Sequence, residues 1–355
     1  MDQVLKVTDD DAFLHLSRII PAHDGKDVRC IVPFRNGFIT GSRDRTSKIF
    51  FPGQTTGNYI EAQLFRGPEH FVASLCVLNP IGSSNSPAKV FLGSNDSFIY
   101  VFSEDEILPL QKLTGHTSTV SCLAANDNKQ QILSGSWDTT CILWNGINGE
   151  KVSVIFGHQA AVWATAFMGD MLLTASADKT IRSWTQEAQL VQTFIGHDDC
   201  VRGIACVNDE FFMTCSNDGT LKRWHINRGL VKSYSCHDSF IYSMAWVEEA
   251  DADQGKKKIG FISVSEDRTM KVWLKGHLAQ TIPLPGSTAW AVTSVSHGQD
   301  QCIYDDIAVA SSTGMVFVFS RDPSRKASED DLSIFQALFE ADAEAAAKAA
   351  AADNQ

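Results

Sequence analysis

The stretch that decides the fold reads GHTSTVSCLAANDNKQQILSGSWDTTCILW and runs from Gly115 to Trp144. Its apolar runs are rich in β-branched residues and predict two strands, a tight turn at Asp138 and a third strand that ends at Trp144. The same spacing of six residues from Asp to an aromatic residue recurs along the chain at Asp44–Phe50, Asp96–Phe102, Asp138–Trp144, Asp178–Trp184, Asp218–Trp224 and Asp267–Trp273, and a seventh frame runs from Thr313 to Phe319.

A histidine recurs upstream of the first six frames, at His23, His70, His116, His158, His197 and His237. The seventh frame has Pro285-Gly286 where that loop should be. Repeats of this length are typical of one four-stranded propeller blade. A single four-stranded sheet cannot bury both faces, whereas seven sheets packed around an axis can. The sequence therefore predicts an all-β, seven-bladed β-propeller.

The two ends of the repeat region complete each other. The apolar run Ala12–Ile20 precedes the first frame, and the seventh frame ends at Ser320 without a fourth strand. Pairing them would close blade 7 and remove open sheet edges, so we expect the propeller to span residues 1–320. Residues 321–355 form a separate tail, in which Ser328 precedes Leu332, Phe335 and Phe339 at helical spacing. We expect a C-terminal helix there.

Insertions fall on one face of the predicted propeller, called the bottom here. They lie between the first and second strands of their blades, at Ile81–Lys89, Glu248–Lys258 and His297–Asp306. The opposite face, the top, carries the histidine loops and the Asp turns, which stay short. We interpret the top as the recognition surface; the alternative is that bottom loops simply tolerate insertion.

Composition limits the class of protein. The chain has 355 residues and a formal charge of −12, which disfavours a partner chosen by phosphate charge, such as nucleic acid. No apolar run is long enough to span a membrane, and the N-terminus does not resemble a signal peptide. Nine scattered cysteines favour a reducing compartment, the cytoplasm or also the nucleus.

Catalysis is not predicted. The chain contains no Gly-rich phosphate loop, no His-Glu-x-x-His and no Cys-x-x-Cys pair. The repeated His, Ser and Asp could suggest a hydrolase triad, but an enzyme needs one such site, whereas a scaffold needs the same bond in every blade. We therefore expect a non-enzymatic protein without a metal or cofactor.

The start of the first strand in each blade identifies candidate top-face residues. An apolar residue such as Val120 or Val162 should point into the packing, and its neighbours on either side should point toward the axis. One neighbouring set reads Asp27, Phe71, Thr119, Ala161, Cys200, Phe240 and Ala289. The other set reads Arg29, Ala73, Ser121, Trp163, Arg202, Tyr242 and Ala291. The residues before the turns add Arg43, Asn95, Trp137, Ala177, Asn217 and Glu266.

Aromatic and arginine side chains dominate these sets. That mixture is typical of protein-binding hot spots, and it suits a protein ligand with a small apolar patch inside a basic rim. The alternative interpretation is that each aromatic side chain lies between neighbouring blades.

The repeat pattern resembles the WD-repeat family. In that family the loop His, the turn Asp, a Ser or Thr and the Trp of the third strand form a hydrogen-bonded network within each blade. The resemblance implies such networks at His116, Asp138 and Trp144, at His158, Asp178 and Trp184, and at His197, Asp218 and Trp224. Blade 7 lacks both the His and the Asp, so we expect it to be more weakly fixed.

A narrower resemblance rests on segments such as LSGSWDTTCILW, GHQAAVWATAF, LLTASADKTIRSW, HDSFIYSMAW and TIPLPGSTAWAV, in this order. Together they resemble the N-terminal propeller of the phospholipase-activating protein family, also called the ubiquitin-fusion-degradation adaptors. The resemblance implies an adaptor in ubiquitin-dependent degradation that binds ubiquitin on its top face. By motif, the ubiquitin contacts fall on Asp27 and Phe240, and we add Arg29, Trp163, Arg202 and Tyr242 as neighbours. Family members also dock on a hexameric AAA ATPase segregase, through domains that we expect to lie outside this chain.

Two other functions stay open. The propeller could be a phosphopeptide receptor that uses Arg29, Arg43 and Arg202 as a phosphate clamp. It could also be a general protein-interaction scaffold that uses the rims of its blades.

Overall fold

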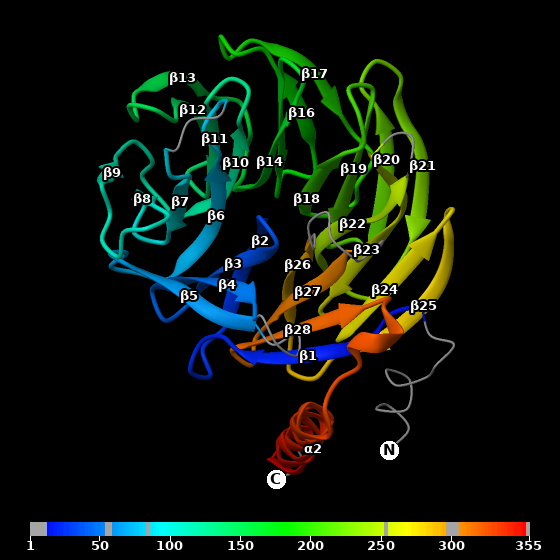
Figure 1. Ribbon diagram of the computed structural model, residues 1–355. Coiled ribbons are helices and arrows are strands. Elements are labelled where there is room, and N and C mark those ends of the chain that lie inside the picture. The colour runs from blue at the N-terminus through cyan, green and yellow to red at the C-terminus, as the bar shows by residue number, and fades with distance from the viewer. Residues whose placement is uncertain (1–12, 54–58, 83–85, 252–254, 296–304, 353–355) are drawn as a thin grey trace.

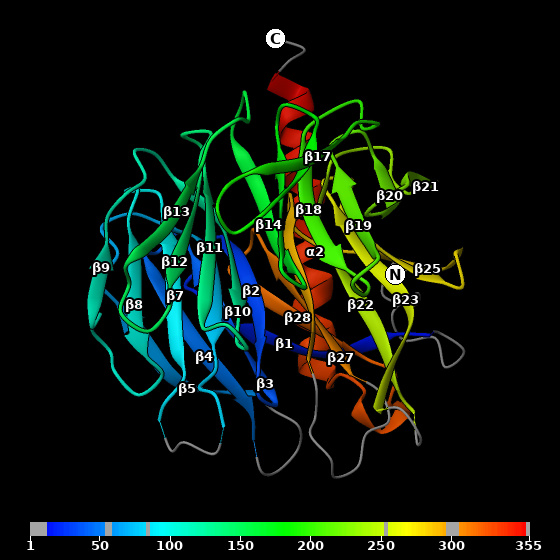
Figure 2. The same cartoon turned by 90° about the horizontal axis from the view of Figure 1, so that it is seen from above.

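The structure is a computed structural model that describes residues 13–53, 59–82, 86–251, 255–295 and 305–352. Within these residues, 28 strands form seven four-stranded antiparallel sheets. The sheets radiate from a central axis (Figure 1). In the view turned by 90°, most of their strands run roughly along this axis (Figure 2). The prediction of a seven-bladed propeller is therefore confirmed.

Each blade is built from consecutive strands, ordered from the axis outward. Blade 1 contains β2(Val28–Phe34), β3(Gly37–Ser42), β4(Thr46–Pro52) and β5(Tyr59–Arg66). Blade 2 contains β6(Val72–Leu78), β7(Lys89–Ser94), β8(Ile99–Ser103) and β9(Gln111–Leu113). Blade 3 contains β10(Val120–Asn126), β11(Gln131–Ser136), β12(Cys141–Asn145) and β13(Lys151–Ile155). Blade 4 contains β14(Val162–Met168), β15(Met171–Ser176), β16(Ile181–Trp184) and β17(Leu190–Phe194).

The last three blades follow the same order, except at the closure. Blade 5 contains β18(Val201–Cys206), β19(Phe211–Ser216), β20(Thr220–His225) and β21(Gly229–Ser235). Blade 6 contains β22(Ile241–Asp251), β23(Gly255–Ser265), β24(Thr269–Leu274) and β25(His277–Pro283). Blade 7 contains β26(Ala289–Val295), β27(Asp306–Ser311), β28(Met315–Ser320) and the N-terminal strand β1(His15–Pro21). A 3-10 helix η1(Pro323–Arg325) and helix α2(Glu329–Ala352) follow.

Blade 7 is closed by the N-terminal strand. Strand β1 pairs antiparallel with β28, from His15 opposite Ser320 to Pro21 opposite Met315. This is the pairing expected for the N-terminal run. Because it joins the first strand of the chain to the last strand of the repeats, opening the ring requires breaking a whole strand pair.

The predicted bottom insertions lie where the first strand of a blade turns into the second. In the second insertion the described residues on either side, Glu248–Asp251 and Gly255–Lys258, extend β22 and β23 and pair with each other. Residues 83–85 of the first insertion, 252–254 of the second and 297–304 of the third lie outside the described residues. None of the described helices is long and apolar enough to cross a membrane.

A hydrogen-bonded latch fixes the top of blade 4. The ionised Asp178 carboxylate accepts from His158 Nδ1 at 2.7 Å, and His158 Nε2 lies 2.8 Å from Thr174 Oγ1. Trp184 Nε1 donates to the same hydroxyl at 2.8 Å. The carboxylate also accepts from the Gln159 backbone N–H, at 3.0 Å. One side chain thus ties the loop before the first strand to the turn between the second and third strands.

The latch recurs with small variations. Blades 3 and 5 repeat it through His116, Asp138 and Trp144 and through His197, Asp218 and Trp224. Blades 1 and 6 keep the His–Asp bond, at 2.6 and 2.7 Å. The hydrogen bonds that the family resemblance implied are therefore present in all three predicted copies.

Blade 2 departs from the predicted pattern. Its turn carboxylate, Asp96, accepts from Tyr100 Oη at 2.9 Å and from the Glu69 backbone N–H at 3.1 Å. His70 is exposed and makes no side-chain bond to Asp96. Counting back from Val72, the loop position that holds His116 in blade 3 is occupied here by Pro68. His70, one of the recurring histidines of the sequence, therefore lies two residues beyond the position of the latch histidine.

The residue after each turn Asp, or after Thr313 in blade 7, has left-handed backbone geometry. Its φ lies between +62° and +81° in all seven blades, at Arg45, Ser97, Thr139, Lys179, Gly219, Arg268 and Gly314. Only two of these are glycine, although left-handed geometry is unfavourable for other residues and most so for a β-branched one such as Thr139. In blades 1 to 6, we infer that the bonds to the Asp carboxylate hold this turn in place.

Blade 7 has neither the His nor the Asp, as its sequence predicts. Its turn is held instead by Thr313 Oγ1, 2.6 Å from Ser311 Oγ. Its loop is held by Asp342 of α2, which accepts from the Gly286 backbone N–H at 2.6 Å. The loop and turn of this blade are therefore bonded through groups other than the His and Asp, and the expectation that the blade is more weakly fixed stays a prediction.

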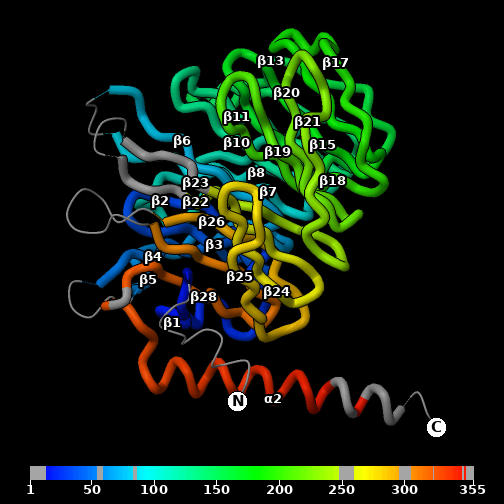
Figure 3. Tube along the Cα trace, turned by 90° about the vertical axis from the view of Figure 1, so that its right-hand side faces the viewer, coloured from blue at the N-terminus to red at the C-terminus, as the bar shows by residue number. Residues whose placement is uncertain are grey.

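Helix α2 packs against the outside of blade 7. It is seen nearly end-on beside β28 and β1 in Figure 1 and lengthwise in Figure 3. Phe335 is fully buried and meets Phe317 edge-on at 5.5 Å between ring centroids. Asp331 accepts from the Ile19 backbone N–H at 3.1 Å, and the Ala327 N–H donates to Leu16 O at 3.0 Å. The helix thus covers the outer edge of the closing strand, which limits edge pairing with other chains.

We predict that Asp178→Asn lowers the free energy of unfolding by about 1–3 kcal/mol at neutral pH, because a charged acceptor of several buried bonds is lost. Burial acts to raise the pKa of Asp178, but hydrogen bonds from His158 and Thr180 outweigh it and leave the pKa lowered. The carboxylate therefore stabilises the fold above the ordinary Asp pKa of about 4, and the stabilisation is lost as pH falls toward the folded-state value.

The stability difference between wild type and Asp178→Asn should accordingly shrink between about pH 5 and pH 2. Denaturant unfolding at each pH measures it, with the exposed Asp209→Asn as control. A difference that stays constant over this range would contradict the latch.

Candidate functional site

Each first strand of a blade carries a bulge near its top. The register shifts after the first residue of the strand, as between Val162 and Ala164, so that one extra residue faces no partner. The same irregularity occurs in all seven blades. A bulge redirects the side chain of its extra residue. Here it supplies the same position, beside the axis, seven times.

These bulge residues form the set that lines the upper end of the central channel. They are Arg29, Ala73, Ser121, Trp163, Arg202, Tyr242 and Trp290. Six of the seven were predicted from the sequence. In blade 7 the prediction was wrong by one residue, because Ala289 is the buried first residue of β26 and Trp290, not Ala291, occupies the bulge. Aligning Pro285 with the loop histidine of the other blades would have identified Trp290.

Cation–π and aromatic contacts connect the large side chains of this set across blade boundaries. The Arg29 guanidinium lies 3.6 Å from the Trp290 ring centroid, and Trp290 lies 4.9 Å from Tyr242. Arg202 lies 5.5 Å from Tyr242 and 4.0 Å from Trp163. We call Arg29, Trp290, Tyr242, Arg202 and Trp163 the top ring. Its contacts lie within the range of favourable cation–π and aromatic interactions.

The top ring is open on one side. Blades 2 and 3 contribute only Ala73 and Ser121 at the equivalent positions. The space enclosed by all seven residues and the strands below them is a cavity of about 330 Å³. The surface therefore has a wall of large side chains over blades 4 to 7 and 1, and a low side over blades 2 and 3.

Charges at the top ring are partly compensated. Asp27 lies 3.9 Å from Arg29 and 3.5 Å from Arg43. Burial lowers the pKa of Arg29, and the nearby Asp27 carboxylate opposes that shift. Arg202 donates from Nε to Asn217 Oδ1 at 2.9 Å. Both ring arginines are thus held by their neighbours, while Arg43 keeps 55% of its side chain exposed.

Two aromatic side chains stand beside the ring and reach solvent. Phe240 is 37% exposed, and its ring lies 6.5 Å from Tyr242. Trp137 is 40% exposed and lies 5.4 Å from Trp163. Phe71, in contrast, is half-buried with the Arg43 guanidinium 5.9 Å from its ring. The interpretation that aromatic side chains lie between blades is therefore wrong for Phe240 and Trp137.

The predicted ubiquitin contacts are connected through this arrangement. Asp27 contacts Arg29, Arg29 stacks on Trp290, Trp290 contacts Tyr242, and Tyr242 contacts Phe240. The chain of contacts crosses from blade 1 through blade 7 to blade 6. Trp163 and Arg202 lie on the far side of Tyr242, in blades 4 and 5. The structure thus brings all six predicted residues to one surface.

The residues that the structure describes include no cluster of three or more His, Cys, Asp or Glu that could hold a metal ion. Cys200, one of the predicted top-face residues, is buried, and burial raises its pKa to about 11 despite the nearby Arg202. A thiol with such a pKa is a poor nucleophile at neutral pH.

Comparison with known proteins identifies the repeats. The family described as "WD domain, G-beta repeat" matches residues 108–145, 149–185, 188–225 and 228–273. These segments run from the last strand of blade 2 to the third strand of blade 6, and the blades with a complete match, 3 to 6, keep the Asp in the turn and a Trp in the third strand.

Relatives match over most of the chain. The ubiquitin fusion degradation protein 3 homolog of Caenorhabditis elegans is 29% identical over 346 residues, 91% of this chain and 37% of that protein. Ubiquitin homeostasis protein lub1 of Schizosaccharomyces pombe is 32% identical over 324 residues, 90% of this chain and 42% of that protein. The crystal structure of the WD40 beta propeller domain of Doa1 matches with a TM-score of 0.74 and 31% identity, covering 88% of this chain and 99% of that one. The chain thus spans about two fifths of the length of these two curated relatives.

We predict that Trp290→Ala lowers the free energy of unfolding by about 1–3 kcal/mol, because Arg29 and Tyr242 both lose a ring contact. Trp137→Ala is the matched control: it removes an exposed Trp whose ring contacts only one other described aromatic side chain, Trp163. Its loss should stay below about 1 kcal/mol. Denaturant unfolding of both variants measures the difference, and equal losses would contradict a stabilising role of the top ring.

Proposed function

Because the chain belongs to the WD-repeat family of the phospholipase-activating and ubiquitin-fusion-degradation proteins, we propose that its propeller binds ubiquitin on the top face. In this proposal the protein is a non-catalytic adaptor in ubiquitin-dependent degradation. The observation that carries it is the continuous set of contacts from Asp27 through the top ring to Phe240.

The chemistry of the surface supports a protein ligand with a small apolar patch. Phe240 and Trp137 offer exposed apolar area, and the half-buried rings behind them are held in place by stacked arginines. Rigid aromatic anchors lose little conformational entropy on binding, so they contribute strongly to affinity. Asp27, flanked by Arg29 and Arg43, adds an acidic group that can meet a basic residue of the partner.

A single binding surface of this size should be weak. We expect a dissociation constant on the order of micromolar or weaker, equivalent to about 5–8 kcal/mol. Tight recognition of ubiquitinated substrates would then depend on several such contacts acting together.

Further partners of the whole protein are also proposals. The family resemblance implies an AAA ATPase segregase, and we assign none of the described residues to that contact. We propose that the protein acts in the cytoplasm, and also in the nucleus. A role with ubiquitinated substrates fits these compartments, and both keep cysteines reduced.

A phosphopeptide receptor is the second candidate function. It would need Arg29, Arg43 and Arg202 to present free donors, but Arg29 is stacked on Trp290 and Arg202 donates to Asn217. Only Arg43 is more than half exposed. The geometry therefore favours ubiquitin. A phosphate clamp would lose its ligand steeply as salt concentration rises, whereas an apolar contact should be much less sensitive.

We predict that Phe240→Ala weakens ubiquitin binding by about tenfold or more, because it truncates an exposed aromatic anchor. The control is Phe156→Ala, since Phe156 is 70% exposed after the outer strand β13 of blade 3 and should not touch the ligand. NMR titration of labelled ubiquitin measures both variants. The proposal fails if ubiquitin signals do not move with wild-type protein, or if Phe240→Ala binds as wild type does.

We further predict that Asp27→Arg weakens ubiquitin binding by about tenfold or more, because it places a third positive charge beside Arg29 and Arg43. Asp24→Arg changes the net charge equally at an exposed position of the same loop and should bind within about twofold of wild type. The same titration separates them, and equal effects of the two variants would indicate a long-range charge effect instead of a contact.

A further inference from the structure

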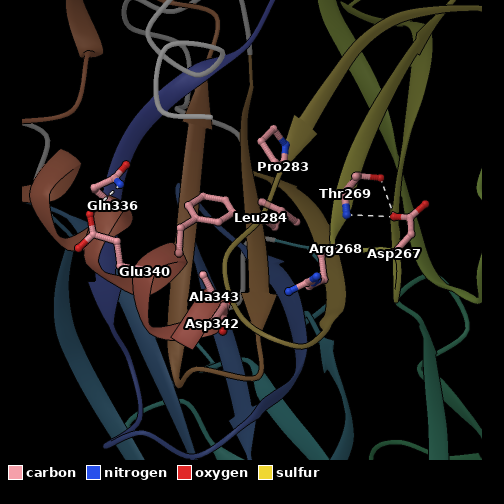
Figure 4. A pocket seen from close by; sticks show the side chains of 10 residues that line it. Asp267, Arg268, Thr269, Pro283, Leu284, Gln336, Glu340, Asp342 and Ala343 are labelled. Carbon is pink, nitrogen blue, oxygen red and sulfur yellow. Dashed lines mark hydrogen bonds between the residues drawn. The ribbon is translucent and has the colours of Figure 1, made fainter. Parts of the chain in front are cut away.

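The loop that precedes β26 in blade 7 is bonded to the C-terminal helix. Gly286 is buried in this loop, with φ of +94°, and its backbone N–H donates to Asp342 Oδ2 of α2 at 2.6 Å. The two residues are 56 positions apart in the chain. Figure 4 shows Asp342 on the part of α2 that lines a pocket together with Leu284.

Gly286 is equivalent to residues of other blades whose backbone N–H donates to the turn Asp. Gly286 lies three residues before the first residue of the innermost strand, as do Glu69, Thr117, Gln159 and Asp198 in their blades. In blades 2 to 5 each of these N–H groups donates to the turn Asp of its own blade, at 2.9–3.1 Å. The equivalence is set by register, because the first residue of each of these strands pairs with the serine that ends the second strand, as Ala289 pairs with Ser311.

Blade 7 has no Asp to accept this bond. Its turn carries Thr313 instead, and the Thr313 side chain faces the loop: a Cβ on Gly286 would lie 2.7 Å from Thr313 Cγ2. Residue 313 is therefore next to Gly286, but its methyl and hydroxyl cannot replace a carboxylate there. The hydroxyl bonds to Ser311.

We infer that Asp342 is a positioning residue that supplies, from α2, the carboxylate missing from the latch of blade 7. The loop that it holds leads within four residues to Trp290, which stacks on Arg29 and contacts Tyr242. Docking of α2 thus helps to position the top-face site, although the helix lies outside the ring of blades. The effect on ubiquitin binding rests on the function proposed above, whereas the effect on the loop does not.

The bond to Asp342 fixes the stretch of α2 around residue 342, which lies beyond the part of the helix that is packed near its start. Near its start α2 is fixed by the burial of Phe335 and by the bond from Ile19 to Asp331. Farther along, a crevice of about 470 Å³ separates the helix from the Arg268 turn of blade 6 (Figure 4). The bond from Gly286 to Asp342 therefore bridges helix and propeller at the edge of this crevice.

The test compares Asp342→Ala with Glu344→Ala, an exposed carboxylate two residues farther along the same helix. Alanine favours helix formation, so neither variant should unwind α2. For Asp342→Ala we expect hydrogen exchange of the Gly286 amide to become about tenfold faster or more, and the Trp290 indole N–H signal to shift in NMR spectra. Ubiquitin affinity should fall by about three- to tenfold. Glu344→Ala should leave all three readouts unchanged.

A second variant separates positioning from a general loss of structure. Thr313→Asp in the Asp342→Ala background restores a carboxylate at the turn, and it should recover the Gly286 protection and the Trp290 signal. Unchanged Gly286 exchange in Asp342→Ala, or no recovery on adding Thr313→Asp, would overturn the inference. If wild-type protein does not bind ubiquitin, the proposed function fails, but the exchange and indole readouts still decide the role of Asp342.

Discussion

The rest of this structure depends on one interaction. At the top of a blade, a single carboxylate accepts several hydrogen bonds. In blade 4, Asp178 joins the loop before the innermost strand to the turn between the next two strands. The turn that it holds contains a left-handed residue, Lys179, which an unsupported turn would rarely adopt. Because the top-face side chains project from such loops and turns, or from the strand beginnings that directly follow the loops, a fixed latch is the condition for a defined binding surface.

Repetition and variation have separate roles in this molecule. The backbone repeats one bulge seven times and so presents seven equivalent positions around the axis. The side chains at these positions differ, from Ala73 to Trp290, and the large ones contact each other across blade boundaries. The asymmetry of the surface, with a wall of aromatic and arginine side chains facing a low side, arises from these differences alone.

The blades that depart from the repeat show where sequence reasoning succeeds and where it stops. The positions of Asp27, Arg29, Arg202 and Phe240 on the top face could be predicted because each is next to the apolar first residue of a strand that follows a regular loop. Trp290 was misplaced because its loop carries Pro285 at the position of the histidine, which removes the marker used to set the register. A shift of one residue in a strand moves a side chain to the other face, so a small error in alignment changes which residue belongs to the site.

The sequence by itself determined the number of blades, the residues of the latches in blades 3 to 5, the closing strand and the helix with Phe335 on its apolar stripe. These features depend on spacing along the chain, which is local information. Only the tertiary structure decided that Arg29 stacks on Trp290, with 261 positions between them in the numbering, and that Asp342 completes blade 7. The physical reason is that closing the ring brings the first blade against the last, and docking α2 brings a distant carboxylate to a buried N–H, so these contacts depend on how the elements pack and not on any period in the sequence.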